Sequence, residues 1–154
     1  MFNISSMIPE SKLIKNEIVL RELAPTQEVK LARKSMVRWL ALSLGLISPN
    51  ESRTLVLDLL EVLFTAHISR QQLTTQDILE RLEKITGVKS KEKAVYYHLL
   101  RLKEFGILYR KNKLYCLGEE GESLSAIFKR FYSERMNKAF EGIEDVLKAF
   151  EYTV

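Results

Sequence analysis

The sequence predicts a mainly α-helical protein with one small β-hairpin, and two observations lead to this fold class. Over most of the chain, apolar residues recur every three or four positions, which is the period of an amphipathic helix. Between residues 107 and 117 the period changes to two, as in a pair of short strands. With 154 residues, of which 46% are hydrophobic, the chain is long enough for one domain with helical extensions.

Two segments near the N-terminus are predicted to be helical. Residues 10–23 fit a short helix or a strand, because their apolar positions partly alternate and partly follow the helical spacing, and we favour the helix. Residues 26–46 predict one long helix, since they contain no proline and repeat apolar residues at helical spacing. The last turns of this helix are apolar nearly all round, which favours burial against more than one surface, such as a partner subunit.

The next helix is predicted to start at Ser48 and to run to about His67. Ser48 can accept hydrogen bonds from the free amides of the first turn, Pro49 suits the first helical position, and Glu51 can complete a capping box. The apolar residues that follow lie on one side and give the helix an ordinary core face.

Two further helices are predicted from the residues at their ends. Thr74 and Asp77 have the spacing of a capping box, and Gly87 can end the helix that they start. Ser90 is placed to cap the third helix of this group, which we expect to end where Gly106 adopts the left-handed conformation.

The two short strands are predicted to form a hairpin around Asn112 and Lys113. Asn112 tolerates the positive φ that such a turn requires, whereas Lys113 is a poorer turn residue than glycine. A two-residue turn places Arg110 opposite Tyr115. The side chains expected to face the core are those of Leu108, Tyr115 and Leu117.

From residue 119 or 120 to about residue 152 the period is again helical. A single helix of that length extends about 45 Å, which is more than a core of this size can cover, and Gly142 is a candidate for a break. The apolar face is too long for the protein's own core and favours a second chain in a symmetric dimer.

Positive charge is concentrated in one region of the chain. The whole protein has a net charge of +4, but residues 89–113 contain eight basic and two acidic side chains, a local charge of +6. Residues 118–154 contain five basic and eight acidic side chains and are negative. We therefore expect residues 89–113 to form a surface that attracts a polyanion, and residues 118–154 to lie away from it.

Three helices, a two-stranded ribbon and a further helix follow one another in the order of a winged helix-turn-helix domain. The stretch AVYYHLLRLKEFGIL resembles the recognition helix and the entry to the wing in the PadR, ArsR and MarR-like families of bacterial and archaeal transcriptional regulators. YCLGEEGESL resembles their second wing strand, so the resemblance covers roughly residues 54–124. PadR-like proteins, which share the wing and a C-terminal dimerisation helix, are the nearest analogy. The resemblance implies a winged helix-turn-helix domain over residues 48–118, followed by a C-terminal helix over 119–154 that is expected to dimerise. Residues 1–47 match none of these families and are predicted to form an N-terminal helical extension with a possible role in dimerisation.

The recognition helix implied by the resemblance, about residues 90–105, is expected to bury one side and to expose the other. Its buried stripe consists of Val95, Leu99 and Leu102. The opposite side and the wing, about residues 107–117, supply side chains suited to phosphates, base edges and thymine methyl groups. The predicted DNA-binding residues are Lys91, Lys93, Ala94, Tyr96, Tyr97, His98, Arg101, Arg110, Lys111 and Lys113. For the two tyrosines and the histidine, a mainly structural role with the ring packed against the body stays open.

The sequence lacks the motifs that are typical of several other classes of function. It has no phosphate-binding glycine loop, no HExxH zinc motif and no nucleophile elbow, so we expect no enzymatic activity. Cys116 is the single cysteine and has no cluster of ligating residues beside it, so we expect neither a metal nor a cofactor. The chain has no apolar run of about 20 residues and no secretory signal, which favours a cytoplasmic protein without membrane contact.

The sequence thus predicts a transcriptional regulator that binds double-stranded DNA as a homodimer formed through its terminal helices. The recognition helix is expected in the major groove and the wing on the backbone. The alternative is a winged-helix subunit of a chromosome-organising or transcription complex, in which the same fold binds another protein.

Overall fold

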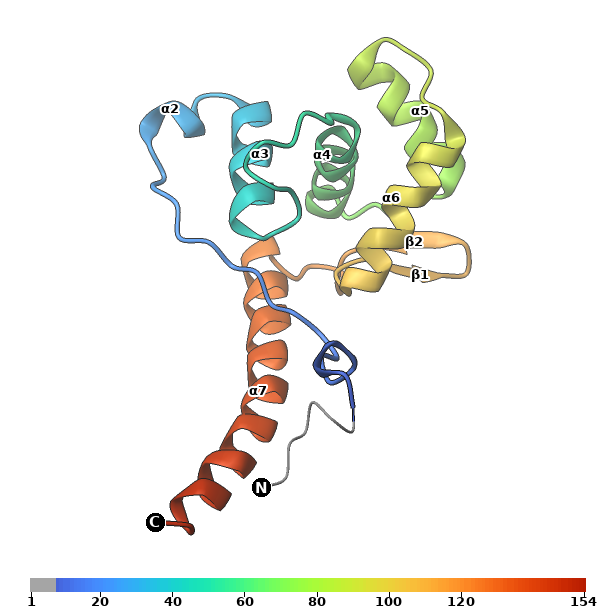
Figure 1. Cartoon of the computed structure of the whole chain (residues 1–154). Helices are drawn as coiled ribbons and strands as arrows, with labels where there is room; N and C mark the ends of the chain where they lie inside the picture. The colour runs from blue at the N-terminus through green and yellow to red at the C-terminus, as the bar shows by residue number, and fades with distance from the viewer. Residues whose placement is uncertain (1–7) are drawn as a thin grey trace.

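The computed structural model describes residues 8–154, most of which lie in helices (Figure 1). Residues 1–7, the first part of the predicted N-terminal extension, lie outside the described residues. The predicted class, mainly α with a small antiparallel hairpin, is confirmed. The elements in chain order are η1 (Glu10–Lys12), α2 (Gln27–Lys30), α3 (Arg33–Ser43), α4 (Leu55–Ile68), α5 (Thr75–Thr86), α6 (Glu92–Phe105), β1 (Tyr109–Lys111), β2 (Leu114–Cys116) and α7 (Leu124–Glu151).

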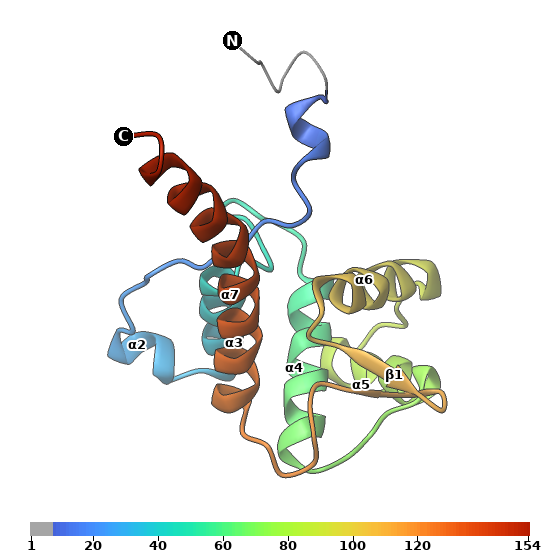
Figure 2. The same cartoon turned by 90° about the horizontal axis from the view of Figure 1, so that it is seen from below.

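Helix α4 lies at the centre of the fold and packs against α3, α5 and α6. Figure 2 shows it between α3 and α7 on one side and α5, α6 and the hairpin on the other. The buried side chains of α4 are all apolar, and Leu59 and Leu60 are completely enclosed. Because α3, α5, α6, the hairpin and α7 all contribute apolar residues to the same cluster, the chain has one continuous core.

The predicted single helix over residues 26–46 is wrong, because the chain turns at Leu31 and Ala32. Leu31 is 83% exposed and Ala32 is extended, with φ at −132°. A helical turn at so exposed a position gains no packing, and short helices are marginal without it. The break separates α2 from α3, whose Val37 and Ala41 are buried in the core.

The helix favoured over residues 10–23 is also wrong, since only the single turn η1 forms and the rest of the segment lacks helical hydrogen bonds. Arg21 holds this segment against the end of α3. The Arg21 amide donates to the Ser43 carbonyl at 2.8 Å, and its guanidinium donates to the carbonyls of Leu42 and Ile47 at 2.6 and 3.0 Å. The Leu42 carbonyl also accepts from the Gly45 amide at 3.2 Å, whereas the Ser43 and Ile47 carbonyls lie where the helix has ended, so Arg21 satisfies groups that water would otherwise have to bind.

The capping box predicted for α5 is present. The Thr74 hydroxyl accepts from the Asp77 amide at 3.1 Å, and the Thr74 amide donates to the Asp77 carboxylate at 3.0 Å. The hydrogen bond from the Thr74 amide, followed by the one from its side chain, lowers the pKa of Asp77. As predicted, Gly87 ends α5 and Gly106 ends α6, both with positive φ.

Two other predicted helix starts are wrong. Helix α4 begins well after Ser48, because the Glu51 amide bonds back to the Ser48 carbonyl at 3.0 Å in a turn. The Glu51 carbonyl accepts from Arg38 at 3.2 Å instead of from a helical amide. Helix α6 begins after Lys91, whose carbonyl accepts the first helical amides, so Ser90 lies one position too early to cap it.

The hairpin has the predicted register, with Arg110 opposite Tyr115. Both turn residues have positive φ, 52° for Asn112 and 65° for Lys113, which is the geometry that matches the twist of the strands. Backbone hydrogen bonds also join Tyr115 to Leu73 just before α5, so β2 has a neighbour on each side. The side chains predicted to face the core are buried, namely Leu108, Tyr115 and Leu117.

Helix α7 is a single helix that Gly142 does not interrupt. It begins later than predicted, because residues 119–122 form a turn and the Ser123 hydroxyl caps the helix by accepting an amide of the first turn. The first half packs on the core through Ile127 and Tyr132. The second half extends beyond the body (Figure 1).

The side chain of Tyr132 joins three distant segments of the chain. Its hydroxyl lies 2.6 Å from the Leu44 carbonyl oxygen at the end of α3 and 3.1 Å from the Val19 carbonyl oxygen in the N-terminal segment. Burial raises the pKa of Tyr132 to about 12, although Arg135 acts in the opposite direction. The hydroxyl therefore stays protonated and donates its hydrogen bond at any physiological pH.

Candidate nucleic-acid interface

Helix α6 has a buried side and an exposed side, as its sequence predicts. The side chains that enter the core are Val95, Leu99 and Leu102. The helical period turns Tyr96 and Tyr97 outwards, where each is about half exposed. Lys93, one turn before them, and Arg101, one turn after them, are exposed on the same side.

The prediction that His98 faces outwards is wrong, since this residue is only 5% exposed. His98 lies three residues after Val95 and four before Leu102, which places it in the same buried stripe. Its side chain lines a cavity of about 40 Å³ together with Gly45 and Leu46. The Nδ1 atom of His98 has no hydrogen-bond partner among the described residues.

The imidazole of His98 is uncharged at neutral pH. Burial lowers its pKa from the ordinary value of 6.5, and the positive charges of Arg101 and Arg53 lower it further. The Glu51 carboxylate acts in the opposite direction and is the smallest of these influences. His98 therefore supports the packing of α6 and adds no positive charge to its outer side.

Arg101 is held over the ring of Tyr97 on the outer side of α6. Its guanidinium carbon lies 5.8 Å from the ring centroid, within the range of a cation–π interaction. The ring of Tyr97 in turn meets the ring of His98 edge-on, with centroids 5.4 Å apart. This arrangement orients the guanidinium before any partner binds and so reduces the side-chain entropy lost on binding.

The hairpin adds a second cationic element next to α6, and its turn points away from α7 (Figures 1 and 2). The guanidinium of Arg110 lies 5.2 Å from the ring centroid of Tyr115, which is buried. Arg110 is therefore anchored on the hairpin while it remains exposed. Lys111 and Lys113 are exposed at the end of the ribbon.

Lys91 and Lys93 lie at the start of α6 and are exposed, and Ala94 in the first turn is half-buried. The ion pairs found among the described residues involve none of the predicted site cations. They join Arg33 to Glu61, Arg53 to Glu51 and Arg130 to Glu122. The cations of α6 and the hairpin are thus free to meet an external anion.

Sequence reasoning missed one exposed side chain on the outer side of α6. Leu100 is about half exposed and lies three residues after Tyr97 and four after Tyr96, so the helical spacing places it on their side. This position could have been found from the helical period. Tyr109 on β1 is also about half exposed, but it lines a different hollow, together with Arg130 and Arg135 of α7.

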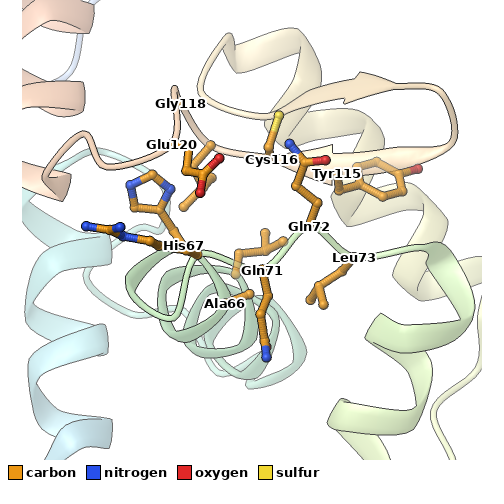
Figure 3. A pocket seen from close by; sticks show the side chains of 12 residues that line it. Ala66, His67, Gln71, Gln72, Leu73, Tyr115, Cys116, Gly118 and Glu120 are labelled. Carbon is orange, nitrogen blue, oxygen red and sulfur yellow. The ribbon is translucent and has the colours of Figure 1, made fainter.

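A pocket of about 300 Å³ lies between the C-terminal end of α4 and strand β2 (Figure 3). His67 lines it, and its Nε2 atom lies 2.5 Å from the Glu122 carbonyl oxygen, which ties α4 to the loop before α7. Cys116 lines the pocket from β2, and burial raises the pKa of its thiol despite the nearby charge of Lys111. The thiol therefore stays protonated at neutral pH, which makes it a poor nucleophile.

Other classes of site find no support in the described part of the chain. Residues 8–154 contain no group of three or more His, Cys, Asp or Glu side chains arranged to hold a metal ion. None of the helices over the same residues combines the length and the apolar composition that a membrane span requires. Comparison with protein-family models, with curated proteins and with solved structures finds no match, so the functional assignment depends on the residues and their geometry.

Proposed function

We propose that this protein binds double-stranded DNA through a winged helix-turn-helix domain over residues 48–118 and regulates transcription. The observation that carries the proposal is that α6 and the neighbouring hairpin both expose cationic side chains, and that α6 also exposes two tyrosines. These side chains together are called the α6–hairpin surface, which consists of Lys91, Lys93, Ala94, Tyr96, Tyr97, Leu100, Arg101, Arg110, Lys111 and Lys113.

The arrangement of the elements supports the proposal. Helices α4, α5 and α6 share one core, and the hairpin follows α6 directly. The backbone pairing of Leu73 with Tyr115 is a β-bridge that joins the loop between α4 and α5 to β2. In winged helix-turn-helix proteins the third helix enters the major groove, and this role falls to α6, with the hairpin as the wing on the backbone.

The side chains of the α6–hairpin surface match the chemistry of a DNA groove. Arg101, oriented by Tyr97, suits a guanine edge or a phosphate. The phenols of Tyr96 and Tyr97 can bond to phosphates while their rings contact thymine methyl groups. Lys111 and Lys113 lie where a wing meets the sugar-phosphate backbone.

Contacts of this kind make affinity depend strongly on salt, because each neutralised phosphate releases condensed counterions. Each contact contributes about −0.9 to the slope of log affinity against log salt concentration. Five phosphate contacts therefore predict a slope of about −4.5. The acidic second half of α7 does not contribute to this slope.

The experiment that tests the proposal is a fluorescence anisotropy titration of labelled random-sequence duplex DNA at several salt concentrations. The double variant Lys111→Ala, Lys113→Ala is expected to reduce the salt slope by about 2, since each lysine accounts for about one phosphate. The matched control is the double variant Lys30→Ala, Lys148→Ala, which removes the same charge from α2 and from the second half of α7 and should keep the wild-type slope. Wild-type binding that is absent or independent of salt contradicts the proposal.

The regulatory step that we propose is occupancy of a promoter, which blocks or recruits the transcription machinery. We place this activity in the cytoplasm, because a single cysteine that is free in the structure suits a reducing compartment. Selection of bound fragments from genomic DNA, followed by sequencing, identifies the target site.

A second candidate function is favoured by the strip that Tyr96, Tyr97 and Leu100 form on α6. Each of these residues is about half exposed, and a protein partner can bury such a strip. In this alternative the chain is a winged-helix subunit of a chromosome-organising or transcription complex. Absent or salt-independent DNA binding in the titration favours the alternative over the first proposal.

A further inference from the structure

A hollow of about 860 Å³ lies between the N-terminal segment, the end of α6 and the middle of α7. Figures 1 and 2 show the chain before α2 passing across α7, with η1 on the same side of α7 as α6. Pockets that hold small molecules usually measure about 300–1,000 Å³. The volume of this α7 hollow therefore suits a ligand of the size of a metabolite.

The α7 hollow has an apolar floor and an apolar wall. The floor consists of Ile107, Leu117 and Ile127, each of which is at most 3% exposed. Leu13 and Ile14 line the hollow from the N-terminal segment and are 48% and 58% exposed. An apolar body in the hollow would remove these two side chains from water, which favours binding.

The α7 hollow also contains a half-buried cation that is held in place. The guanidinium of Arg135 donates to the Phe105 carbonyl at the end of α6 and lies 4.5 Å from the ring centroid of Phe131. Gly106 leaves room for it, because a Cβ at this position would lie 2.7 Å from the Nη2 atom. None of the ion pairs among the described residues includes Arg135. An oxyanion in the hollow can accept from the N–H groups that the Phe105 carbonyl does not use.

Positive charge predominates in the lining of the α7 hollow. Four basic and two acidic side chains line it, namely Lys15, Arg130, Arg135, Lys138, Glu134 and Glu141. Arg130 pairs with Glu122, which leaves three of the cations outside the ion pairs of the described residues. Both acidic side chains are exposed, where water weakens their fields, whereas the half-buried Arg135 acts more strongly on a ligand. The charges therefore favour an anionic ligand.

We propose that the α7 hollow binds a small amphipathic anion, namely an organic carboxylate with an apolar body. The apolar body lies on the floor, and the carboxylate accepts hydrogen bonds from Arg135, with the charge of Lys138 beside it. A guanidinium and a carboxylate can form two parallel hydrogen bonds, which fix the orientation of the ligand. An extended polyanion fits less well, because it has no apolar body for the floor and would meet Glu134 and Glu141. Binding in this hollow is independent of the proposed DNA binding.

The N-terminal segment forms a wall of the α7 hollow that a ligand should hold in place. No backbone amide of residues 14–20 donates a hydrogen bond to another described residue. The nearest anchors are the Tyr132 hydroxyl on the Val19 carbonyl and the bonds of Arg21. Contacts of a ligand with Leu13 and Ile14 therefore add to a wall that has few hydrogen bonds of its own.

The first test is isothermal titration calorimetry of the full chain without DNA. The probes are decanoate and naphthalene-2-carboxylate, which combine the anion with a flexible and a flat apolar body. Their dissociation constants are expected to be on the order of 100 µM. Decylammonium, with the opposite charge, and acetate, without the apolar body, should bind at least about tenfold more weakly. Absent saturable binding of both probes overturns the proposal, as does equal affinity for either control compound.

Variants place the bound probe in the α7 hollow. Arg135→Gln is expected to raise the dissociation constant of the probe about tenfold, and Lys138→Gln about threefold. The matched control, Lys129→Gln, removes the same charge from α7 outside the hollow and should keep the wild-type constant. Ala139→Trp fills the hollow from an exposed helical position and should abolish binding.

Circular dichroism and urea unfolding check that these variants remain folded. Lys138 is exposed, so Lys138→Gln and Ala139→Trp decide the matter if Arg135→Gln disturbs the end of α6. Wild-type affinity in both of these variants places the probe elsewhere and overturns the proposal. Because no DNA is present, this result is separate from the outcome of the DNA titration.

Limited digestion with trypsin tests the contact with the N-terminal segment. At ten times its dissociation constant, decanoate is expected to slow cleavage after Lys15 about tenfold, because the bound ligand must leave before the wall can open. Cleavage after Lys30 at the end of α2, outside the hollow, is the internal control and should keep its rate. Mass spectrometry of the fragments separates the two sites. Unchanged cleavage after Lys15 at saturating decanoate contradicts the proposed site.

Discussion

The backbone of Tyr115 on β2 is hydrogen-bonded in both directions to Leu73, the residue before the cap of α5. The Tyr115 amide donates to the Leu73 carbonyl at 2.7 Å, and the Leu73 amide donates to the Tyr115 carbonyl at 3.3 Å. A two-stranded hairpin alone is at best marginally stable in water. The pairing with Leu73, together with burial of the Tyr115 ring, therefore fixes the hairpin to the α4–α5 loop.

Glycine substitutions in the hairpin can separate the effect of backbone conformation on stability from the effect of losing a positive charge. Lys113 has a φ of 65°, a region that costs an L-residue about 1–2 kcal/mol and costs glycine almost nothing. We expect Lys113→Gly to raise the free energy of unfolding by about 1 kcal/mol, as measured by urea denaturation. The control Lys111→Gly removes the same charge from a strand and should lower it by about 0.5–1 kcal/mol. The interpretation fails if both variants shift the stability in the same direction.

Two of the three serine or threonine residues predicted as helix caps, Thr74 and Ser90, should respond differently to truncation. Thr74 bonds to Asp77 in a complete capping box, so Thr74→Ala is expected to lower the free energy of unfolding by about 1 kcal/mol. Ser90 lies outside the cap of α6, so Ser90→Ala should change it by less than about 0.5 kcal/mol. Thermal or chemical unfolding of the two proteins side by side measures the difference, and equal losses would show that Ser90 also caps its helix.

Stability should fall on mild acidification because of His98. Its pKa in the folded protein lies below the ordinary value of 6.5, so the unfolded chain takes up the proton first as the pH falls. The free energy of unfolding is thus at its full value above pH 6.5 and declines as the pH falls through the lower pKa of the folded state. Urea unfolding at a series of pH values measures this decline.

The variant His98→Leu tests whether His98 causes this decline in the free energy of unfolding at low pH. A leucine of similar volume leaves no unpartnered nitrogen, so its stability at neutral pH should stay within about 1.5 kcal/mol of the wild type. The variant should also lose the decline, because nothing at position 98 then titrates. A decline of unchanged size in the variant would place its origin elsewhere in the molecule.

The parts of the fold that the sequence predicts well depend on short-range chemistry. The capping box of α5 and the glycine ends of α5 and α6 involve residues at most four positions apart, so they are visible in the sequence. Two predictions that were wrong, the start of α4 at Ser48 and the helix over residues 10–23, concern segments that bind distant partners. The bond from Arg38 to the Glu51 carbonyl crosses from α3 to the next loop, and Arg21 reaches the end of α3 from the N-terminal segment. No local sequence pattern predicts such long-range contacts.

The candidate site could be predicted in large part, since the exposed tyrosines and cations of α6 and the hairpin follow from periodicity and charge. His98 was misplaced because the polarity of its ring was given more weight than its spacing from Val95 and Leu102. Gly45 and Leu46, which line a cavity together with His98, follow the end of α3 and could not be assigned to α6 from the sequence. The placement of Arg101 over Tyr97 likewise depends on side-chain conformation, which spacing does not fix.

The hydrogen bonds of Tyr132 have a consequence for synthesis on the ribosome. Val19 and Leu44 emerge long before Tyr132, whose hydroxyl meets both of their carbonyls. The nascent chain therefore holds α3 and α4 with an uncovered apolar side until α7 has left the exit tunnel. Translation products that stop before α7 expose this side permanently, which makes them substrates for chaperones and quality-control proteases.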